Sequence, residues 1–69
     1  MTLTPVRSSN LAAVGYDPST ATLVIQFRSG DVYQYDSVPS SIYRGLRRAA
    51  SPGGYFAAAI RPFYRYRRR

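Results

Sequence analysis

Hydrophobic and polar residues alternate along the segment TLVIQFR. The large apolar residues Leu23, Ile25 and Phe27 fall on one side of it, and mainly polar residues occupy the other. A period of two is typical of a β-strand that buries one face. Short apolar segments at residues 11–16 and 32–36 predict further strands before and after it.

The loop between the second and third strands decides which side chains are buried. A two-residue loop would place Tyr33 and Tyr35 on the polar side of the preceding strand. A three-residue loop, residues 28–30, would pair Phe27 with Asp31 and move both tyrosines to the apolar side, because a shift of one residue reverses every side chain. We favour the longer loop, which collects five large side chains on one face and puts a glycine where a left-handed conformation is needed.

Residues 37–51 have the spacing of an amphipathic helix. Pro39 lies near its start, where a missing N–H costs nothing. The predicted inner stripe consists of Ile42, Leu46 and Ala49 or Ala50, with Tyr43 at its edge. The basic residues share the opposite side and are Arg44, Arg47 and Arg48.

Residues 51–61 predict a second helix, with Ser51 as N-cap and Pro52 in the first turn. The side chains expected to face inward are Phe56, Ala59, Ile60 and Phe63. Pro62 should end or bend the helix. The closing segment FYRYRRR then predicts either a last strand or an extended tail.

Composition limits the chain to one small domain. It has 69 residues, no cysteine and no histidine, so neither a disulfide nor a zinc cluster can stabilise it, and we expect no bound metal. Small domains without such supports rely on dense aromatic packing or on self-association. Since the chain holds seven tyrosines and three phenylalanines, we also expect a homo-oligomer.

All ten basic residues are arginine, and the net charge is +7. Arginine suits bidentate phosphate contacts and stacking on bases, which favours a nucleotide ligand. A GC-rich genome would produce the same absence of lysine without any role in binding. The placement of the charge is therefore more informative than its total, and six of the ten arginines fall at or after Arg48.

Three stretches of the chain follow the motif order of a known family. They are VRSSNLAAVGYD, TLVIQFRSGDVYQYDSVPSSIYRGLRRAASPGGYFAAAIR and FYRYR, and together they span residues 6–67. In this order they resemble the KTSC domain, which is named for its occurrence at the C-terminus of some lysyl-tRNA synthetases. Family members usually carry a polar or basic residue in place of Pro52, so this chain lacks one side chain that could contact a ligand.

The resemblance implies an α+β fold, with a small antiparallel sheet of three to four strands packed with two short helices. We expect one such domain over residues 1–69, with a basic C-terminal tail at residues 65–69. The resemblance implies no enzymatic activity. Because the domain occurs as an appendage of synthetases, it is expected to contact RNA. Free-standing copies similar to this chain occur on phage and bacterial chromosomes, and we expect a cytoplasmic protein of a bacterial cell, with a phage gene as one possible origin. Nothing in the chain resembles a signal peptide or a membrane-spanning segment, and no membrane partner is expected.

Catalysis has little support in the residue types. The chain has no His, Cys or Lys, so the usual general bases and activated nucleophiles are missing. Each of the three carboxylates, Asp17, Asp31 and Asp36, has a structural position in a turn, a hairpin or before a helix. We therefore expect a protein that is not an enzyme and has no cofactor.

The start of the second helix is the strongest candidate site. Ser51 can cap the helix while the N–H groups of Gly53 and Gly54 stay open to an anion at the positive end of the helix dipole. Arg61 and Arg65 are expected to contact the phosphate as well, and the face formed by Arg44, Arg47 and Arg48 supplies auxiliary charge. The competing interpretation is that Ser-Pro-Gly-Gly only turns the chain between two helices.

Aromatic residues beside the arginines are candidates for base stacking, namely Tyr55, Tyr64 and Tyr66. Tyr33, Tyr35 and Tyr43 are expected in the core or at its rim. The run from Arg67 to Arg69 is expected to be a solvated tail without specific contacts.

These features predict a non-catalytic module that binds nucleotide phosphates in RNA or single-stranded nucleic acid. One alternative is a small oligomeric sponge that sequesters a nucleotide second messenger, for example for a phage against host signalling. Another is a protein-interaction module for acidic partners. A polynucleotide complex would weaken steeply with salt, and a buried nucleotide pocket would respond less.

Overall fold

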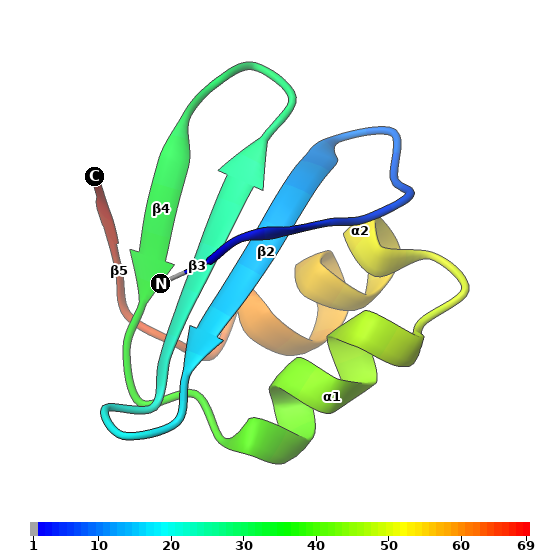
Figure 1. The fold of residues 1–69 in the computed structure, drawn as a ribbon. Coiled ribbons are helices and arrows are strands. Elements are labelled where there is room, and N and C mark those ends of the chain that lie inside the picture. The colour runs from blue at the N-terminus through cyan, green and yellow to red at the C-terminus, as the bar shows by residue number, and fades with distance from the viewer. Residues whose placement is uncertain (1) are drawn as a thin grey trace.

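The computed structural model describes residues 2–69 and shows an α+β fold (Figure 1). A five-stranded antiparallel sheet has the order β1-β2-β3-β4-β5. Its strands are β1 (Thr4–Pro5), β2 (Leu11–Asp17), β3 (Thr22–Phe27), β4 (Val32–Tyr35) and β5 (Tyr66–Arg68). The fold class is as predicted, but the strand count of three to four was too low, because β1 is only two residues long and shows no alternating pattern.

The three-residue hairpin loop between β3 and β4 is confirmed. Phe27 N donates to the Asp31 carbonyl at 2.8 Å, and Ile25 is the register partner of Tyr33. Gly30 has φ +98°, a conformation that glycine adopts without steric cost. Burial therefore selects the register, as the alternation in β3 predicts.

Two helical segments pack together against one face of the sheet (Figure 1). The first is α1 (Ser40–Arg48), which follows Pro39 directly. The second begins as α2 (Pro52–Tyr55) and continues as one π-helical turn, η1 (Phe56–Ile60). Ser51 caps it as predicted, since its hydroxyl accepts the Gly54 N–H at 3.2 Å.

The core lies between the sheet and these helices. Its buried members are Leu11, Val14, Leu23, Ile25, Tyr35, Val38, Leu46, Phe56 and Ile60. The prediction that Phe63 faces inward was wrong, because this side chain is 72% exposed. The π turn adds a residue to the helical period, and the chain turns away after Ile60, so the spacing that placed Phe63 inward is lost.

The prediction that residues 67–69 form a solvated tail without specific contacts was also wrong, and of the two alternatives for the closing segment the structure has the last strand. Tyr66 pairs with Tyr35 in the antiparallel ladder between β4 and β5. Arg67 forms an ion pair with Asp36 at 3.3 Å, and Arg68 forms one with Asp31 at 2.6 Å. The C-terminal arginines therefore make specific contacts as part of an edge strand.

Within residues 2–69, no helix is long and apolar enough to cross a membrane.

Candidate functional site

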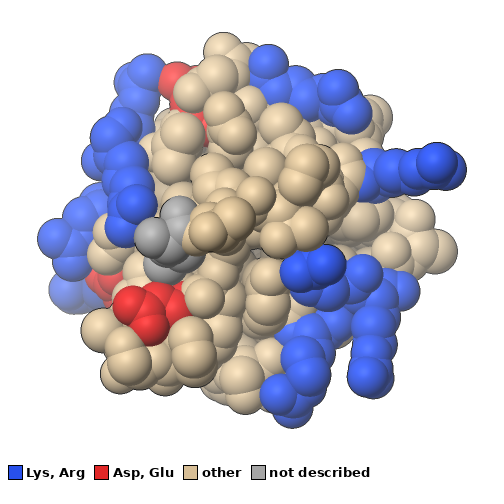
Figure 2. Space-filling model, in the orientation of Figure 1, with Lys and Arg blue, Asp and Glu red and all other residues tan. Residues whose placement is uncertain are grey.

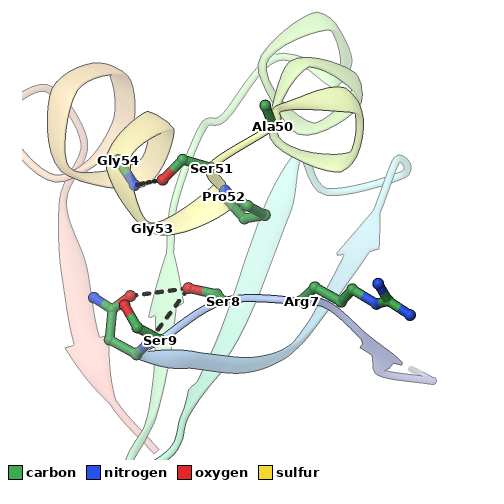
Figure 3. Close-up of a pocket in the computed structure, with 9 residues that line it drawn as sticks. Arg7, Ser8, Ser9, Ala50, Ser51, Pro52, Gly53 and Gly54 are labelled. Carbon is green, nitrogen blue, oxygen red and sulfur yellow. Dashed lines mark hydrogen bonds between the residues drawn. The ribbon is translucent and has the colours of Figure 1, made fainter.

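A polar pocket of about 550 Å³ lies at the start of α2 and is called the helix-start pocket below. One wall is the segment 7–10, which leads into β2, and the other is the segment 50–54, which begins α2 (Figure 3). The two walls are far apart in the sequence, so only the folded chain forms this site.

The cap at Ser51 determines which backbone groups of this pocket are free. Its hydroxyl accepts the Gly54 N–H, and its carbonyl accepts the Tyr55 N–H at 2.9 Å. Pro52 has no N–H. Within the described residues the Gly53 N–H has no acceptor, so one donor remains at the positive end of the helix. The expectation that the Gly54 N–H stays uncovered was wrong.

The opposite wall is held by hydrogen bonds around Ser8. Its hydroxyl donates to Asn10 Oδ1 at 3.0 Å and accepts the Leu11 N–H at 3.2 Å. Its carbonyl accepts from Arg28 Nε at 2.7 Å. A Cβ at Gly53 would overlap Asn10 Oδ1 and lie 3.0 Å from Ser8 Oγ. Glycine at this position therefore lets the two walls approach closely.

A second glycine sets the position of α2 against α1. A Cβ at Gly45 would overlap the Tyr55 hydroxyl and lie 2.7 Å from Cζ of the same ring. Tyr55 thus packs directly on the backbone of α1, and it belongs to the partly buried shell of the core. This packing occupies the ring that was expected to stack on a base.

Positive charge at the helix-start pocket has no carboxylate beside it. Arg7 lines the pocket and is exposed, and no acidic residue lines it. Both ion pairs formed by residues 2–69 lie at the β4–β5 edge instead. Figure 2 shows this division, with acidic side chains beside the arginines of the β5 side and none among those of the helix side.

The hydrogen bonds of the carboxylates keep them charged. Hydrogen bonds from Ser19 lower the pKa of Asp17 below its usual value. A hydrogen bond from Gln34, followed by the contact with Arg67, lowers the pKa of Asp36. Neither carboxylate lines the helix-start pocket.

The structure separates the arginines that were expected to meet at the phosphate. Arg61 lines a different, aromatic pocket. Arg65 lies beside Asp36, whose N–H donates to the Arg65 carbonyl at 2.9 Å. Neither of them lines the helix-start pocket with Ser51, Gly53 and Gly54.

The auxiliary arginines lie on α1 near this pocket. Arg47 and Arg7 line an adjoining hollow of about 350 Å³. Arg47 donates to the Tyr43 hydroxyl at 2.9 Å, and Arg44 donates to the Ser40 hydroxyl at 3.2 Å. Arg47 is thus the auxiliary arginine that the structure places beside the site, while Arg44 and the exposed Arg48 line neither hollow.

The tyrosines expected at the core or its rim are there. Tyr35 is 2% exposed, and Tyr33 and Tyr43 pack partly buried against the core. Tyr64 also belongs to this shell, whereas Tyr66 is 60% exposed. Of the three rings proposed for stacking, Tyr66 is therefore the most exposed.

Reasoning from the sequence missed Arg7 and Asn10 as site residues. The local pattern RSSN before a strand is typical of a turn in which Ser and Asn bond to nearby backbone. That pattern predicts the hydrogen bonds of Ser8, but it does not indicate that the turn crosses to the start of α2.

The comparisons with known proteins agree with this fold. The family model described as the KTSC domain matches residues 7–66. The chain belongs to the KTSC family. A solved structure of a KTSC domain protein from Yersinia pestis superposes with a TM-score of 0.96 at 35% identity and covers 99% of this chain and 96% of its own.

Two kinds of relatives share the KTSC domain. A protein of Stutzerimonas stutzeri strain A1501 is 39% identical over 62 residues, which cover 88% of this chain and 87% of that protein. A lysine–tRNA ligase of Nostoc sp. is 37% identical over 60 residues, which cover 87% of this chain but 11% of the ligase. The KTSC domain thus occurs both as most of a small protein and as a minor part of a large one.

Proposed function

We propose that this KTSC domain is a non-catalytic module that binds nucleotide phosphates, as found in RNA or single-stranded nucleic acid. The observation that carries the proposal is the free N–H of Gly53, which lies at the start of α2 in a pocket shared with Arg7. A backbone donor at a helix start and an arginine are two common ways to bind a phosphate. No carboxylate lines the pocket, so no formal negative charge there repels an anion.

The residue types in the pocket support binding over catalysis. Arginine is the titratable side chain that lines it, and arginine stays protonated, so it cannot act as a general base. The lining hydroxyls of Ser8 and Ser51 are engaged with backbone N–H groups. The segment shared with lysine–tRNA ligases makes RNA the first ligand to test.

The proposal can be tested with two variants that remove the same charge. Arg7→Ala removes an arginine from the pocket, and Arg69→Ala removes one that contacts Gln34 at the opposite edge. We expect Arg7→Ala to weaken binding of a labelled single-stranded RNA about tenfold or more, because a charge-assisted contact is lost, and Arg69→Ala to weaken it much less. Fluorescence anisotropy at several salt concentrations measures both. Equal losses in the two variants would contradict a localised phosphate site.

The oligomeric sponge is a second candidate, favoured by the 72% exposure of Phe63 in so small a chain. Self-association would cover this ring, and pockets of neighbouring subunits could enclose a small nucleotide. Sedimentation equilibrium would detect an oligomer, and its nucleotide binding would depend weakly on salt. A monomer that binds RNA with a steep salt dependence would exclude the sponge. If the protein is a monomer that binds neither RNA nor a small nucleotide, the remaining candidate function is recognition of an acidic protein partner.

A further inference from the structure

An aromatic pocket of about 260 Å³ borders the helix-start pocket, and Asn10 lines both. Its other lining residues include Phe27, Tyr33, Tyr35, Arg61 and Tyr66. Tyr33 and Tyr66 stack with ring centroids 5.5 Å apart. Phe27 meets Tyr33 edge-on at 5.6 Å. The pocket is thus built from rings held in fixed mutual orientations.

The Tyr35 hydroxyl opens into this pocket without a partner. The residue is 2% exposed, yet its hydroxyl makes no hydrogen bond to the described residues. No fully enclosed side-chain polar atom among them lacks a partner, so this hydroxyl must be accessible from the pocket that Tyr35 lines. Burial, and next the neighbouring Tyr66 and Tyr33, raise the pKa of Tyr35 to about 12. The phenol therefore keeps its proton at neutral pH and can donate a hydrogen bond.

Strand β5 holds an exposed ring beside this hydroxyl. Tyr66 is the register partner of Tyr35, and its ring centroid lies 5.8 Å from that of Tyr35. The ion pairs of Arg67 and Arg68 follow directly in the same strand. Tyr66 nevertheless remains 60% exposed, so one aromatic surface is oriented in advance and still accessible.

These groups select for a flat ring with a polar edge. An organic cation would suit an aromatic box, but Arg61 and the net charge of +7 oppose it. A purely apolar ring would leave the Tyr35 hydroxyl buried without a partner, which costs free energy. A nucleobase offers both a stacking face and hydrogen-bonding atoms.

We propose that the aromatic pocket binds the base of the nucleotide whose phosphate occupies the helix-start pocket. The base stacks on Tyr66, and its polar edge bonds to the Tyr35 hydroxyl and to Arg61. Asn10 lies between the two halves of the ligand. The phosphate half of this assignment rests on the proposed function, whereas the base half rests on the aromatic pocket alone.

Three probes separate the two halves: adenosine, inorganic phosphate and adenosine 5′-monophosphate. Amide and aromatic NMR titrations of the full chain measure their affinities. Tyr35→Phe should weaken adenosine binding about two- to tenfold by removing one hydrogen bond. Tyr66→Leu should weaken it about five- to hundredfold by removing the stacking ring. Neither variant should change phosphate binding. Tyr64→Phe, which removes a hydroxyl outside both pockets, is the matched control and should bind like the wild type.

The outcomes distinguish failure of this inference from failure of the proposed function. Adenosine that does not bind, or that binds Tyr35→Phe and Tyr66→Leu as tightly as the wild type, overturns the base site. If phosphate still binds and Arg7→Ala abolishes that binding, the proposed function stands without the base site. Adenosine binding that depends on both tyrosines, together with no phosphate binding, keeps the base site and overturns the phosphate site. The Tyr35 hydroxyl has no hydrogen-bond partner among residues 2–69, so Tyr35→Phe should fold normally, and its NMR spectrum will check this.

Discussion

The two arginine-rich regions of this KTSC domain differ in what surrounds their charge. At the β5 edge, Arg67 and Arg68 each face a carboxylate, and both serve to attach the last strand to the sheet. At the helix-start pocket, Arg7 lies among lining residues that include no carboxylate. The C-terminal segment has the higher density of arginine, yet the pocket has the charge that remains available to an anion.

This difference shows that a count of charges along the chain does not locate a binding surface. The positions of the acidic residues determine which arginines stay available, because two of the three carboxylates form ion pairs at the β5 edge. Exposed ion pairs contribute little to stability individually, but they fix which charges are neutralised. Two glycines shape the region around the helix-start pocket: Gly45 lets Tyr55 pack on α1, and Gly53 lets the two walls of the pocket approach each other.

The largest expected effect comes from the packing that positions the pocket. Gly45→Ala should destabilise the fold by about 1–3 kcal/mol, because its Cβ would overlap the Tyr55 hydroxyl and force this ring out of its contact with α1, which outweighs the higher helix propensity of alanine. Urea denaturation measures the loss. Gly30→Ala is a useful comparison, since its strain arises from the positive φ with no atom within reach of the new Cβ. A Gly45→Ala variant as stable as the wild type would mean that Tyr55 does not set the position of α2.

Deletion of residues 67–69 should have the next largest effect. We expect a loss of about 1–2 kcal/mol, because the pairing of residues 67 and 68 with β4 and the hydrogen bond from the Arg69 N–H to the Val32 carbonyl disappear. The double variant Arg67→Gln and Arg68→Gln keeps the strand and should lose only a fraction of this. Thermal unfolding distinguishes the two. If the deletion left stability unchanged, the segment would be the solvated tail that its sequence suggests.

The smallest expected effect is a change in acid sensitivity. The folded-state pKa of Asp36 lies below the ordinary value of 3.8, so its contribution to stability is present above that pH and is lost as the pH falls through the lower folded value. Asp36→Asn should therefore reduce the loss of stability between neutral pH and about pH 2. Asp17, whose pKa is also lowered, still contributes to the loss of stability at low pH in this variant. Arg44→Ala, which removes an arginine that takes part in neither ion pair of residues 2–69, should leave the acid profile unchanged, and a change there would contradict the division between the two regions.

Sequence patterns predicted most of the fold because they depend on local burial. The alternation in β3 was enough to choose the hairpin register, and Ser51-Pro52 was enough to mark the start of α2. The π turn at residues 56–60 was not predictable in this way. For the closing segment the pattern left a last strand and an extended tail open, and only the pairing with β4, which is distant in sequence, decides for the strand.

Only one of the two walls of the candidate site was predicted from the sequence. Ser51 and Gly53 follow local rules for the start of a helix, and they do line the pocket. The opposite wall comes from residues 7–10, about forty positions earlier in the chain, and no local rule connects the two. Arg61 and Arg65 were assigned by proximity in sequence, which the turn after Ile60 makes misleading.

Titration of the labelled full chain with inorganic phosphate tests the central claim most directly. Its amide and arginine Nε NMR signals report on both arginine regions in one experiment. We expect the largest shifts at the Gly53 amide and at Arg7 Nε, with little change at Arg67 and Arg68. Shifts concentrated on Arg67 and Arg68, or an unchanged Gly53 amide at saturating phosphate, would contradict the account.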